Sequence, residues 1–300
     1  MAQETTLVGL DVGTSKVACV VAKVGMDGKA DIVGIGQHAA HGGLQKGVVV
    51  NIEATAEAIR QAVQEAEMMG DVQVRSVLVG IAGQHISGMD SHGVVRVKGS
   101  EVSEEDVARV IEAAKAVNLP ADRRIVHVLE QEYVIDGQGG VREPVGMSGV
   151  RLEAQVYLIT AAASAVENLM RCCKRCGLYV EDVVLQQLAS AEAVLSDEER
   201  EMGVAVVDIG EGTTDIIVIA RGGVRHVSSL PVGGGHLTND LMAALRTSRR
   251  AAEAIKRRYG AARAALVDDA EVEVPGVGGR SPRTISRQQM VQFLEMRVDE

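Results

Sequence analysis

The chain has 300 residues, of which 46% are hydrophobic, with a formal net charge of −10 and a pI near 5.3. Such a length and apolar content suffice to bury a substantial core and suggest about two domains. The acidic balance argues against general nucleic-acid binding, which needs a basic surface, and a sequence with one Phe, four Tyr and no Trp offers few base-stacking platforms.

The first predicted element is a β-hairpin with an Asp-x-Gly turn. An apolar strand ends at Asp11, the turn contains Gly13, Thr14 and Ser15, and a second strand follows over Val17–Val21. Glycine lets the backbone approach an anion and point N–H groups at it. A carboxylate at a strand end can hold hydrated Mg²⁺ against phosphates. The segment is therefore predicted to face phosphate, although many turns carry Asp-x-Gly alone.

An α/β layer follows this hairpin. Residues Ile32–Gly36 and Val74–Ile81 are predicted strands, and apolar residues at helical spacing predict a helix that begins after Asn51 and ends at Gly70. From about residue 84 the pattern changes to short strands, with a helix that begins at Ser103 in a capping-box-like sequence and a glycine-rich stretch over 137–140. We expect an inserted subdomain of some 75 residues.

The α/β pattern resumes before a second copy of the hairpin. Helices are predicted over Ala163–Cys176 and Gln187–Leu195, and the acidic stretch 196–201 is predicted to be an exposed connector. Val206-Val-Asp-Ile-Gly-Glu-Gly-Thr-Thr-Asp215 then repeats the strand and the Asp-x-Gly turn. Asp208 takes the place of Asp11, with Gly210, Gly212 and Thr213 in the turn. Two such hairpins predict a clamp for nucleotide phosphates.

The C-terminal part combines helices with a glycine- and proline-containing loop. Helices are expected from near Thr238, around Ile255 and over Ser286–Asp299, with the loop at Pro275–Pro282. The chain stops inside the last helical pattern, so we expect a fragment of a longer protein.

Several features favour a cytoplasmic location. No basic stretch precedes the first strand, so no signal peptide is predicted, and no apolar run approaches the roughly 18 residues of a membrane span. Four clustered or isolated cysteines, Cys19, Cys172, Cys173 and Cys176, do not make a disulfide framework. Reduced thiols are expected.

Several segments between and around the hairpins carry a resemblance to a known family. The paired hairpins resemble the phosphate loops of the actin, Hsp70 and sugar-kinase superfamily. The segments 129–137 (Leu-Glu-Gln-Glu-Tyr-Val-Ile-Asp-Gly) and 144–154 (Pro-Val-Gly-Met-Ser-Gly-Val-Arg-Leu-Glu-Ala) are similar to the FtsA family of bacterial cell-division proteins. So are 47–51, 188–195 and 234–240.

The resemblance implies an actin-like (ribonuclease H-like) fold of duplicated α/β domains with an inserted α+β subdomain 1C, of the SHS2 type, and ATP in the cleft between the halves. The implied boundaries are 1–84 with 161–190 for subdomain 1A, 85–160 for 1C, 191–231 with an incomplete 286–300 for 2A, and 232–285 for 2B.

The resemblance also implies roles for single residues. Asp11 and Asp208 would face Mg²⁺ through its waters, and Gln186 would orient the attacking water, so that Gln186 and Asp208 are the catalytic candidates. The nucleotide would meet the first loop, the second loop and the segment Ala252–Lys256. The full set of cofactor-binding candidates is Asp11, Gly13, Thr14, Ser15, Gly210, Gly212, Thr213, Glu253 and Lys256.

In function, the resemblance implies an ATP-binding protein of the division site that polymerises on the cytoplasmic face of the inner membrane and tethers the FtsZ ring. The FtsZ C-terminal peptide would bind 2B, later division proteins would bind 1C, and a C-terminal helix not in this chain would bind the membrane. Glu211 stands where the superfamily usually has a small residue, so at most weak ATPase activity is expected. The alternatives are a small-molecule kinase of the same superfamily and an actin-like scaffold for pili or cell shape.

Overall fold

The computed structural model describes residues 5–40 and 42–300. The prediction that the chain has no signal peptide concerns its N-terminal residues. Of these, residues 1–4 lie outside the described residues. The chain divides into two compact units. The first runs to Asp208 and resumes over Thr213–Pro231, and the second contains Ile209–Gly212 and Val232–Glu300.

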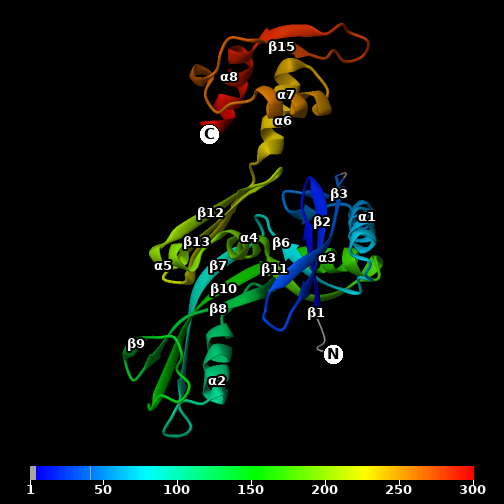
Figure 1. The fold of residues 1–300 in the computed structure, drawn as a ribbon. Helices are drawn as coiled ribbons and strands as arrows, with labels where there is room; N and C mark the ends of the chain where they lie inside the picture. Colours follow the sequence, from blue (N-terminus) through cyan, green and yellow to red (C-terminus); the bar gives the residue numbers. More distant parts are fainter. Residues whose placement is uncertain (1–4, 41) are drawn as a thin grey trace. The chain divides into compact units, whose positions relative to one another are not determined.

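A five-stranded sheet in the first unit carries the first hairpin (Figure 1). Strands β1 (Thr5–Val12) and β2 (Lys16–Val24) pair antiparallel, as predicted, and β6 (Ser76–Ile81) lies parallel to β1 on its other side. The strand order is β11-β6-β1-β2-β3, with β3 spanning Ala30–Ala39 and β11 spanning Tyr179–Leu185. A minor ladder joins β4 (Leu44–Gln45) to β5 (Val48–Val49).

Two helices, α1 (Ile52–Gly70) and α3 (Ala163–Arg175), pack on one face of this sheet. The Asn51 side chain caps α1 by accepting from the Ala54 N–H. A Cβ atom at Gly36 would lie 1.9 Å from the Ala62 carbonyl oxygen, so glycine lets β3 approach the helix closely. Both predicted helices are confirmed.

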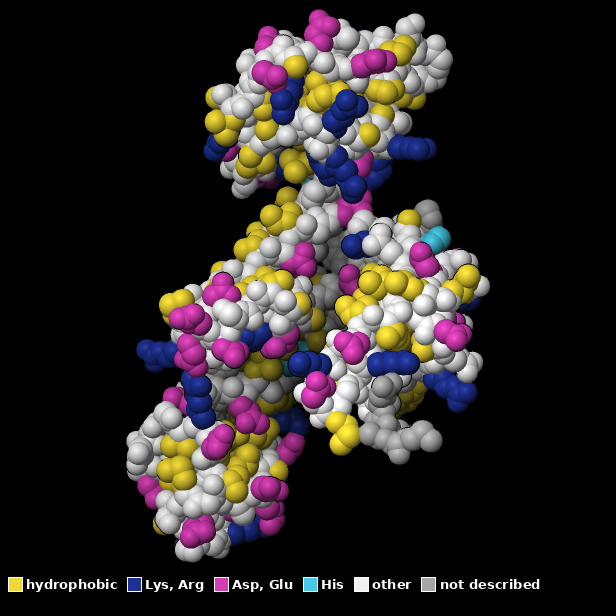
Figure 2. All heavy atoms as spheres, in the orientation of Figure 1, with side chains coloured by type: hydrophobic (Ala, Val, Ile, Leu, Met, Phe, Trp, Pro, Cys, Tyr) yellow, Lys and Arg dark blue, Asp and Glu magenta, His cyan; other side chains and the backbone are white. Residues whose placement is uncertain are grey.

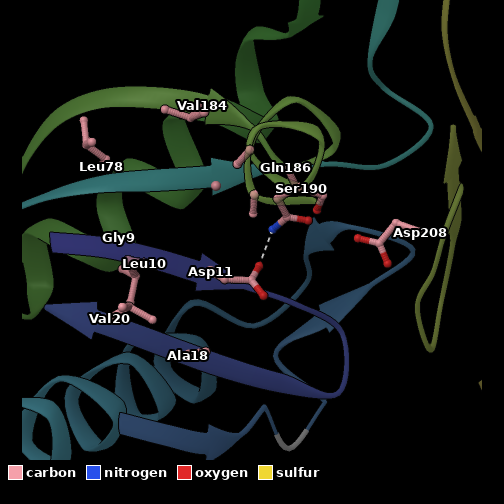
Figure 3. Close-up of a pocket in the computed structure, with 13 residues that line it drawn as sticks. Gly9, Leu10, Asp11, Ala18, Val20, Leu78, Val184, Gln186, Ser190 and Asp208 are labelled. Atoms are coloured by element: carbon pink, nitrogen blue, oxygen red, sulfur yellow. Dashed lines mark hydrogen bonds between the residues drawn. The ribbon is translucent and has the colours of Figure 1, made fainter. Parts of the chain in front are cut away.

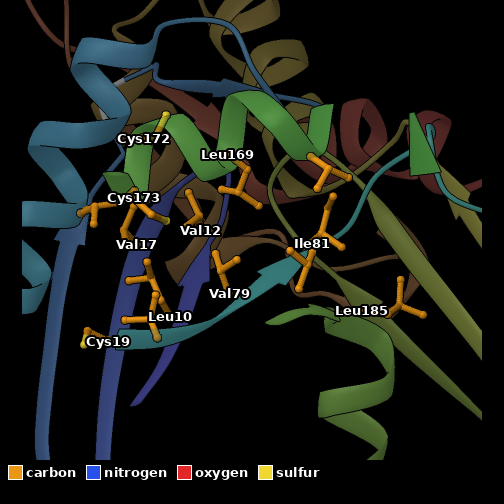
Figure 4. Packing of buried hydrophobic residues seen from close by; sticks show 14 of the residues in the cluster. Leu10, Val12, Val17, Cys19, Val79, Ile81, Leu169, Cys172, Cys173 and Leu185 are labelled. Carbon is orange, nitrogen blue, oxygen red and sulfur yellow. The ribbon is translucent and has the colours of Figure 1, made fainter. Parts of the chain in front are cut away.

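The core between the sheet and these helices is aliphatic (Figure 4). Leu10, Val17 and Val79 are at most 2 % exposed. The four cysteines are free thiols, as expected, and burial raises the pKa of Cys19 and Cys172 to about 11. They are therefore packing residues rather than nucleophiles at neutral pH.

The inserted segment forms a four-stranded sheet in the order β7-β10-β8-β9. Its strands are β7 (Ser87–Arg96), β8 (Arg123–Ile135), β9 (Gln138–Val141) and β10 (Arg151–Ala162), and α2 (Glu104–Lys115) packs on β7 and β10. Ser103 and Asp106 form the predicted capping box of α2. No element was predicted for the glycine-rich stretch 137–140, and residues 138–141 pair with β8 as an edge strand.

The second hairpin belongs to a three-stranded sheet, β12 (Val204–Ile209), β13 (Thr214–Ala220) and β14 (Gly223–Leu230). Helices α4 (Gln186–Val194) and α5 (Asp197–Met202) both contact β13. The acidic stretch is exposed as predicted, but it forms the helix α5 rather than an irregular connector, because Ser196 and Glu199 build a capping box.

The second unit has its own core. It contains α6 (Gly234–Leu245), α7 (Arg249–Tyr259), a 3₁₀ turn (Ala264–Leu266), the hairpin β15 (Glu271–Val274) and β16 (Arg283–Ser286), and α8 (Arg287–Val298). The hairpin was not predicted, and the predicted loop 275–282 is its connection. Helix α6 begins at Gly234, before the predicted start near Thr238. The subdomain boundaries given above stay predictions.

Acidic and basic side chains are interspersed over the face of the first unit shown in Figure 2. Within the described ranges, none of the helices has the length and apolar character needed to cross a membrane.

Candidate functional site

Asp11 and Gln186 meet at one edge of the five-stranded sheet. Because β1, β6 and β11 are parallel, their carboxyl ends share that edge. Asp11 lies near the end of β1, and Gln186 follows β11 as the first residue of α4. The Gln186 Nε2 donates to Asp11 Oδ1 at 2.6 Å (Figure 3). Gly80 of β6 leaves room for this contact, since a Cβ there would lie 2.9 Å from Gln186 Cγ.

These two residues line one cavity of about 580 Å³ together with Asp208. Asp11, Gln186 and Asp208 supply polar groups to the lining, and most of the other walls are small or apolar. The other lining residues are Gly9, Leu10, Ala18, Val20, Leu78, Gly80, Val184, Ala189, Ser190 and Ala193. Of the site residues predicted in the two hairpins, Asp11 and Asp208 therefore line this cavity.

Both aspartates carry raised pKa values. Burial is the main cause of the raised pKa of Asp11, the charge of Asp208 adds to it, and Lys16 and the Gln186 hydrogen bond oppose it. Burial and the charge of Asp215 raise the pKa of Asp208, while Lys16 again opposes. Two like charges with raised pKa values form a site that a cation would stabilise.

The donor set fits a hydrated Mg²⁺, which prefers oxygen ligands and retains several waters. Among the residues that the structure describes, no group of three or more His, Cys, Asp or Glu side chains could hold a metal ion. Asp11 and Asp208 are therefore the carboxylates that would hold the hydrated ion, and water molecules would supply its other ligands.

The first turn is closed by its own backbone. The Gly13 N–H donates to the Lys16 carbonyl at 2.9 Å, and a Cβ at Gly13 would lie 3.0 Å from the same oxygen. The predicted use of this N–H for phosphate is therefore at odds with its bond in this structure. Thr14 is partly buried and Ser15 is exposed beside it.

The second turn is supported by a buried carboxylate that sequence reasoning missed. Thr213 Oγ1 donates to Asp215 Oδ2 at 2.7 Å, and Gln187 Nε2 donates to Asp215 Oδ1 at 3.1 Å. Gln187 is 1 % exposed and Asp215 is 6 % exposed. The Thr213 hydroxyl thus points inward, which leaves its backbone for any phosphate. Asp215 directly precedes the apolar run Ile216–Ile219, which was the available signal, whereas Gln187 lies in a helix of mixed composition that offered none.

The first turn of α4 consequently contacts both hairpins. Gln186 donates to Asp11 of the first hairpin, and its neighbour Gln187 donates to Asp215 of the second. Neighbouring side chains on a helix point in different directions, so two adjacent glutamines can bridge two sheets. The sequence predicted the first of these contacts only in part, through Gln186.

In the second unit, Glu211 is paired rather than free. Its carboxylate accepts from the Arg249 guanidinium, which also donates to Asn239. The carbonyls of Gly210 and Glu211 accept the N–H groups of Gly234 and Gly235 at 2.9 and 2.8 Å, at the start of α6. Gly212, also in this stretch, is buried.

Glu253 and Lys256 lie together on α7. Lys256 Nζ contacts Glu253 at 2.7 Å and donates to the Gly234 carbonyl and to Thr238 Oγ1, each at 2.9 Å. Burial opposes ionisation of Glu253, but hydrogen bonds from Lys256, Thr238 and Arg257 lower its pKa to about 2. Glu253 and Lys256, both candidates for nucleotide contact, thus belong to the second unit, where they form an ion pair with each other.

The fold places the chain among actin-like proteins. It matches the solved MreB5 of Spiroplasma citri bound to AMPPNP with a TM-score of 0.54 at 14% identity, covering 99% of this chain and 76% of that one. It matches a structure of the PilM-PilN type IV pilus biogenesis complex with a TM-score of 0.60 at 20% identity, covering 84% of this chain and 69% of that one. At such identities the likeness concerns the fold alone.

Sequence comparison then gives the family. The model of the SHS2 domain inserted in FtsA matches residues 83–160, and that of the cell division protein FtsA matches 205–292. FtsA of Pseudomonas aeruginosa is 51% identical over 98% of this chain and 70% of its own length, and FtsA of Escherichia coli K12 is 42% identical over the same shares. FtsA of Bacillus subtilis is 37% identical over 98% of this chain and 67% of its own. The chain belongs to the FtsA family of cell-division proteins.

Proposed function

We propose that this cell-division protein binds Mg-ATP at the polar end of the cavity that Asp11, Gln186 and Asp208 line. The observation that carries the proposal is the Asp11–Gln186 contact beside Asp208, where two copies of one hairpin present carboxylates with raised pKa. Asp11 and Asp208 would hold Mg²⁺ through its waters, and the ion would offset charge on the phosphates. The actin-like neighbour MreB5 was solved with AMPPNP, which supports a nucleotide as the ligand.

Gln186 sets a limit on hydrolysis. Its amide NH₂ donates to Asp11, which leaves its carbonyl oxygen to accept a hydrogen bond from a water. An amide orients a water without removing its proton, so this residue positions and does not act as a general base. We infer slow ATP turnover at most, with ATP serving mainly to stabilise one conformation. Gly13, Thr14, Ser15, Gly210, Gly212, Thr213, Glu253 and Lys256 remain proposed nucleotide contacts.

The binding proposal is tested by calorimetry of ATP with and without Mg²⁺. Asp208→Ala should weaken Mg-ATP binding by tenfold or more, because a hydrogen bond to a charged group contributes about 1.5–3 kcal/mol. Asp31→Ala makes a matched control, because Asp31 lies opposite Lys23 in the β2–β3 ladder, at the other end of these strands from Asp11. Unchanged affinity in Asp208→Ala would refute the site.

We further propose that the second unit binds the C-terminal peptide of FtsZ, and that the protein tethers the FtsZ ring at the cytoplasmic face of the inner membrane. A hollow of about 350 Å³ lies between α6 and α8, lined by Asp240, Ala243, Ala244, Phe293, Met296, Arg297 and Glu300. Met296 is 65 % exposed there, beside the Arg297–Asp240 ion pair. Arg297 also pairs with Glu300, and apolar lining residues beside these charged groups suit a short peptide.

Fluorescence anisotropy with a labelled FtsZ C-terminal peptide tests this site. Met296→Ser should reduce the affinity about tenfold, because burial of an exposed methionine contributes roughly 1.5–3 kcal/mol. Met68→Ser is the matched control, since Met68 is 78 % exposed on α1 in the other unit. Equal affinities of the two variants would exclude the hollow. Filament formation through self-association and contacts of the inserted sheet with other division proteins remain proposals of the family resemblance.

A further inference from the structure

A histidine of the inserted sheet contacts the backbone at the edge of the candidate site. The Leu185 N–H donates to His127 Nε2 at 2.9 Å. His127 lies on β8, where it pairs with Ile159 of β10. Leu185 is the last residue of β11 and is fully buried. The bond therefore joins the inserted sheet to the five-stranded sheet at the point where β11 ends.

The direction of this bond fixes the state of the imidazole. Because Nε2 accepts a hydrogen bond, it carries no proton, and the ring is neutral with its proton on Nδ1. Burial lowers the pKa of His127, against a smaller opposing effect of the Asp182 carboxylate. The acceptor is therefore present at neutral pH. Without it, the buried Leu185 N–H would be unsatisfied, which destabilises this backbone position.

The Leu185–His127 hydrogen bond lies directly before two residues of the candidate site. Leu185 is the N-cap of α4, and no side chain of its own caps that helix. The next two residues, Gln186 and Gln187, contact Asp11 and Asp215. A shift of the backbone at Leu185 would move both glutamines, and with them the contacts to both hairpins.

We propose that His127 is a positioning residue that couples the inserted sheet to the nucleotide site, because it anchors the strand–helix junction that carries Gln186 and Gln187. The inference rests on the proposed Mg-ATP site. Coupling between sites is reciprocal. If His127 helps place Gln186 for the nucleotide, then nucleotide binding stabilises the part of β8 that contains His127.

The experiment combines Mg-ATP affinity with hydrogen exchange on the whole chain. His127→Gln retains an acceptor near the place of Nε2, whereas His127→Phe keeps a planar ring without one, and His127→Leu serves if the Phe variant does not fold. In the wild type and His127→Gln, Mg-ATP should slow exchange in residues 123–135 as well as around Asp11. In His127→Phe we expect affinity reduced about three- to tenfold, with protection around Asp11 but none in 123–135.

If His127 only supported the fold, its variants would unfold at a lower denaturant concentration, but Mg-ATP would still slow exchange in residues 123–135. Wild-type affinity together with protection of 123–135 in His127→Phe would overturn the inference while leaving the Mg-ATP site intact. Absence of Mg-ATP binding by the wild-type chain would instead overturn the proposed function itself. Loss of coupling in His127→Phe with rescue by His127→Gln supports the anchor.

Discussion

The two hairpins carry the same turn chemistry in different packing. In the first, β1 is flanked by β2 and β6, and Leu10 and Val12 are 2 % and 4 % exposed. In the second, β12 is the edge strand of its sheet, and Val207 and Ile209 are 51 % and 71 % exposed. Yet Asp11 and Asp208 both have raised pKa values and both line the cavity.

The comparison shows that the Asp-x-Gly turn and the packing of its strand are independent features. The Asp-x-Gly turn places a carboxylate at the end of a strand in either setting. Stability comes from the packing of the strand behind it, which is strong for β1 and weak for β12. The first hairpin is therefore a rigid platform, whereas local opening is expected more readily at the second. Occupancy of the site should stabilise the second hairpin more than the first.

The largest expected effect is on the free energy of unfolding, when one side chain on β1 and one on β12 are each replaced by alanine. Leu10→Ala should lower the free energy of unfolding by about 2–5 kcal/mol, because it opens a cavity in a packed core. Val207→Ala should cost about 0.5 kcal/mol or less, because the side chain is half exposed. Denaturant unfolding of both variants without nucleotide is the measurement. Equal losses would show that β12 is packed as tightly as β1.

A second prediction concerns Glu211, which distinguishes the second turn from the first. Arg249 pairs with its carboxylate, so Glu211→Gln alone should change Mg-ATP affinity by less than about threefold. Arg249→Ala removes the partner and should weaken binding about three- to tenfold by leaving a free negative charge in the turn. The double variant Glu211→Gln/Arg249→Ala should recover most of the affinity. No recovery would assign the loss to another role of Arg249.

The smallest expected effect compares the aspartates without ligand. A folded-state pKa above the unfolded value means that the protonated form is favoured by folding. That stability is fully present below the unfolded pKa and is lost as pH rises through the folded pKa. Asp11→Asn and Asp208→Asn should therefore each raise the Tm by ~1 °C or less at pH 7, because both residues are exposed and solvent screens their charges, and leave it nearly unchanged near pH 3. A lower Tm at pH 7 would show that these charges are satisfied in the free protein.

The hairpins and the main helices were predictable because their signals are local. The Asp-x-Gly turns, the Asn51 cap and the Ser103 capping box each lie within a few residues of the element that they define. Strand β9 was missed although its partner is the strand directly before it, because Gln138-Gly-Gly-Val141 has few of the β-branched and aromatic residues that indicate a strand. The β15–β16 hairpin was missed because its two strands are short and the loop 275–282 between them has none of the two-residue turn signals of a tight hairpin.

The site was predictable at its two aspartates and Gln186, and less so behind them. Gln187 became a site residue only when folding buried it against Asp215. His127 belongs to no motif in the sequence, and its role as a hydrogen-bond acceptor depends on β8 lying against the end of β11. Tertiary contacts between separate sheets leave no periodic signal in the sequence.

The most direct test of the account is the Mg²⁺ dependence of ATP affinity in the wild type, Asp11→Asn and Asp208→Asn. If the two hairpins hold one ion together despite their different packing, each substitution should remove most of the gain in affinity that Mg²⁺ gives the wild type. A full Mg²⁺ effect retained in Asp208→Asn but lost in Asp11→Asn would contradict the account, because the second hairpin would then repeat the sequence of the first without sharing its chemistry.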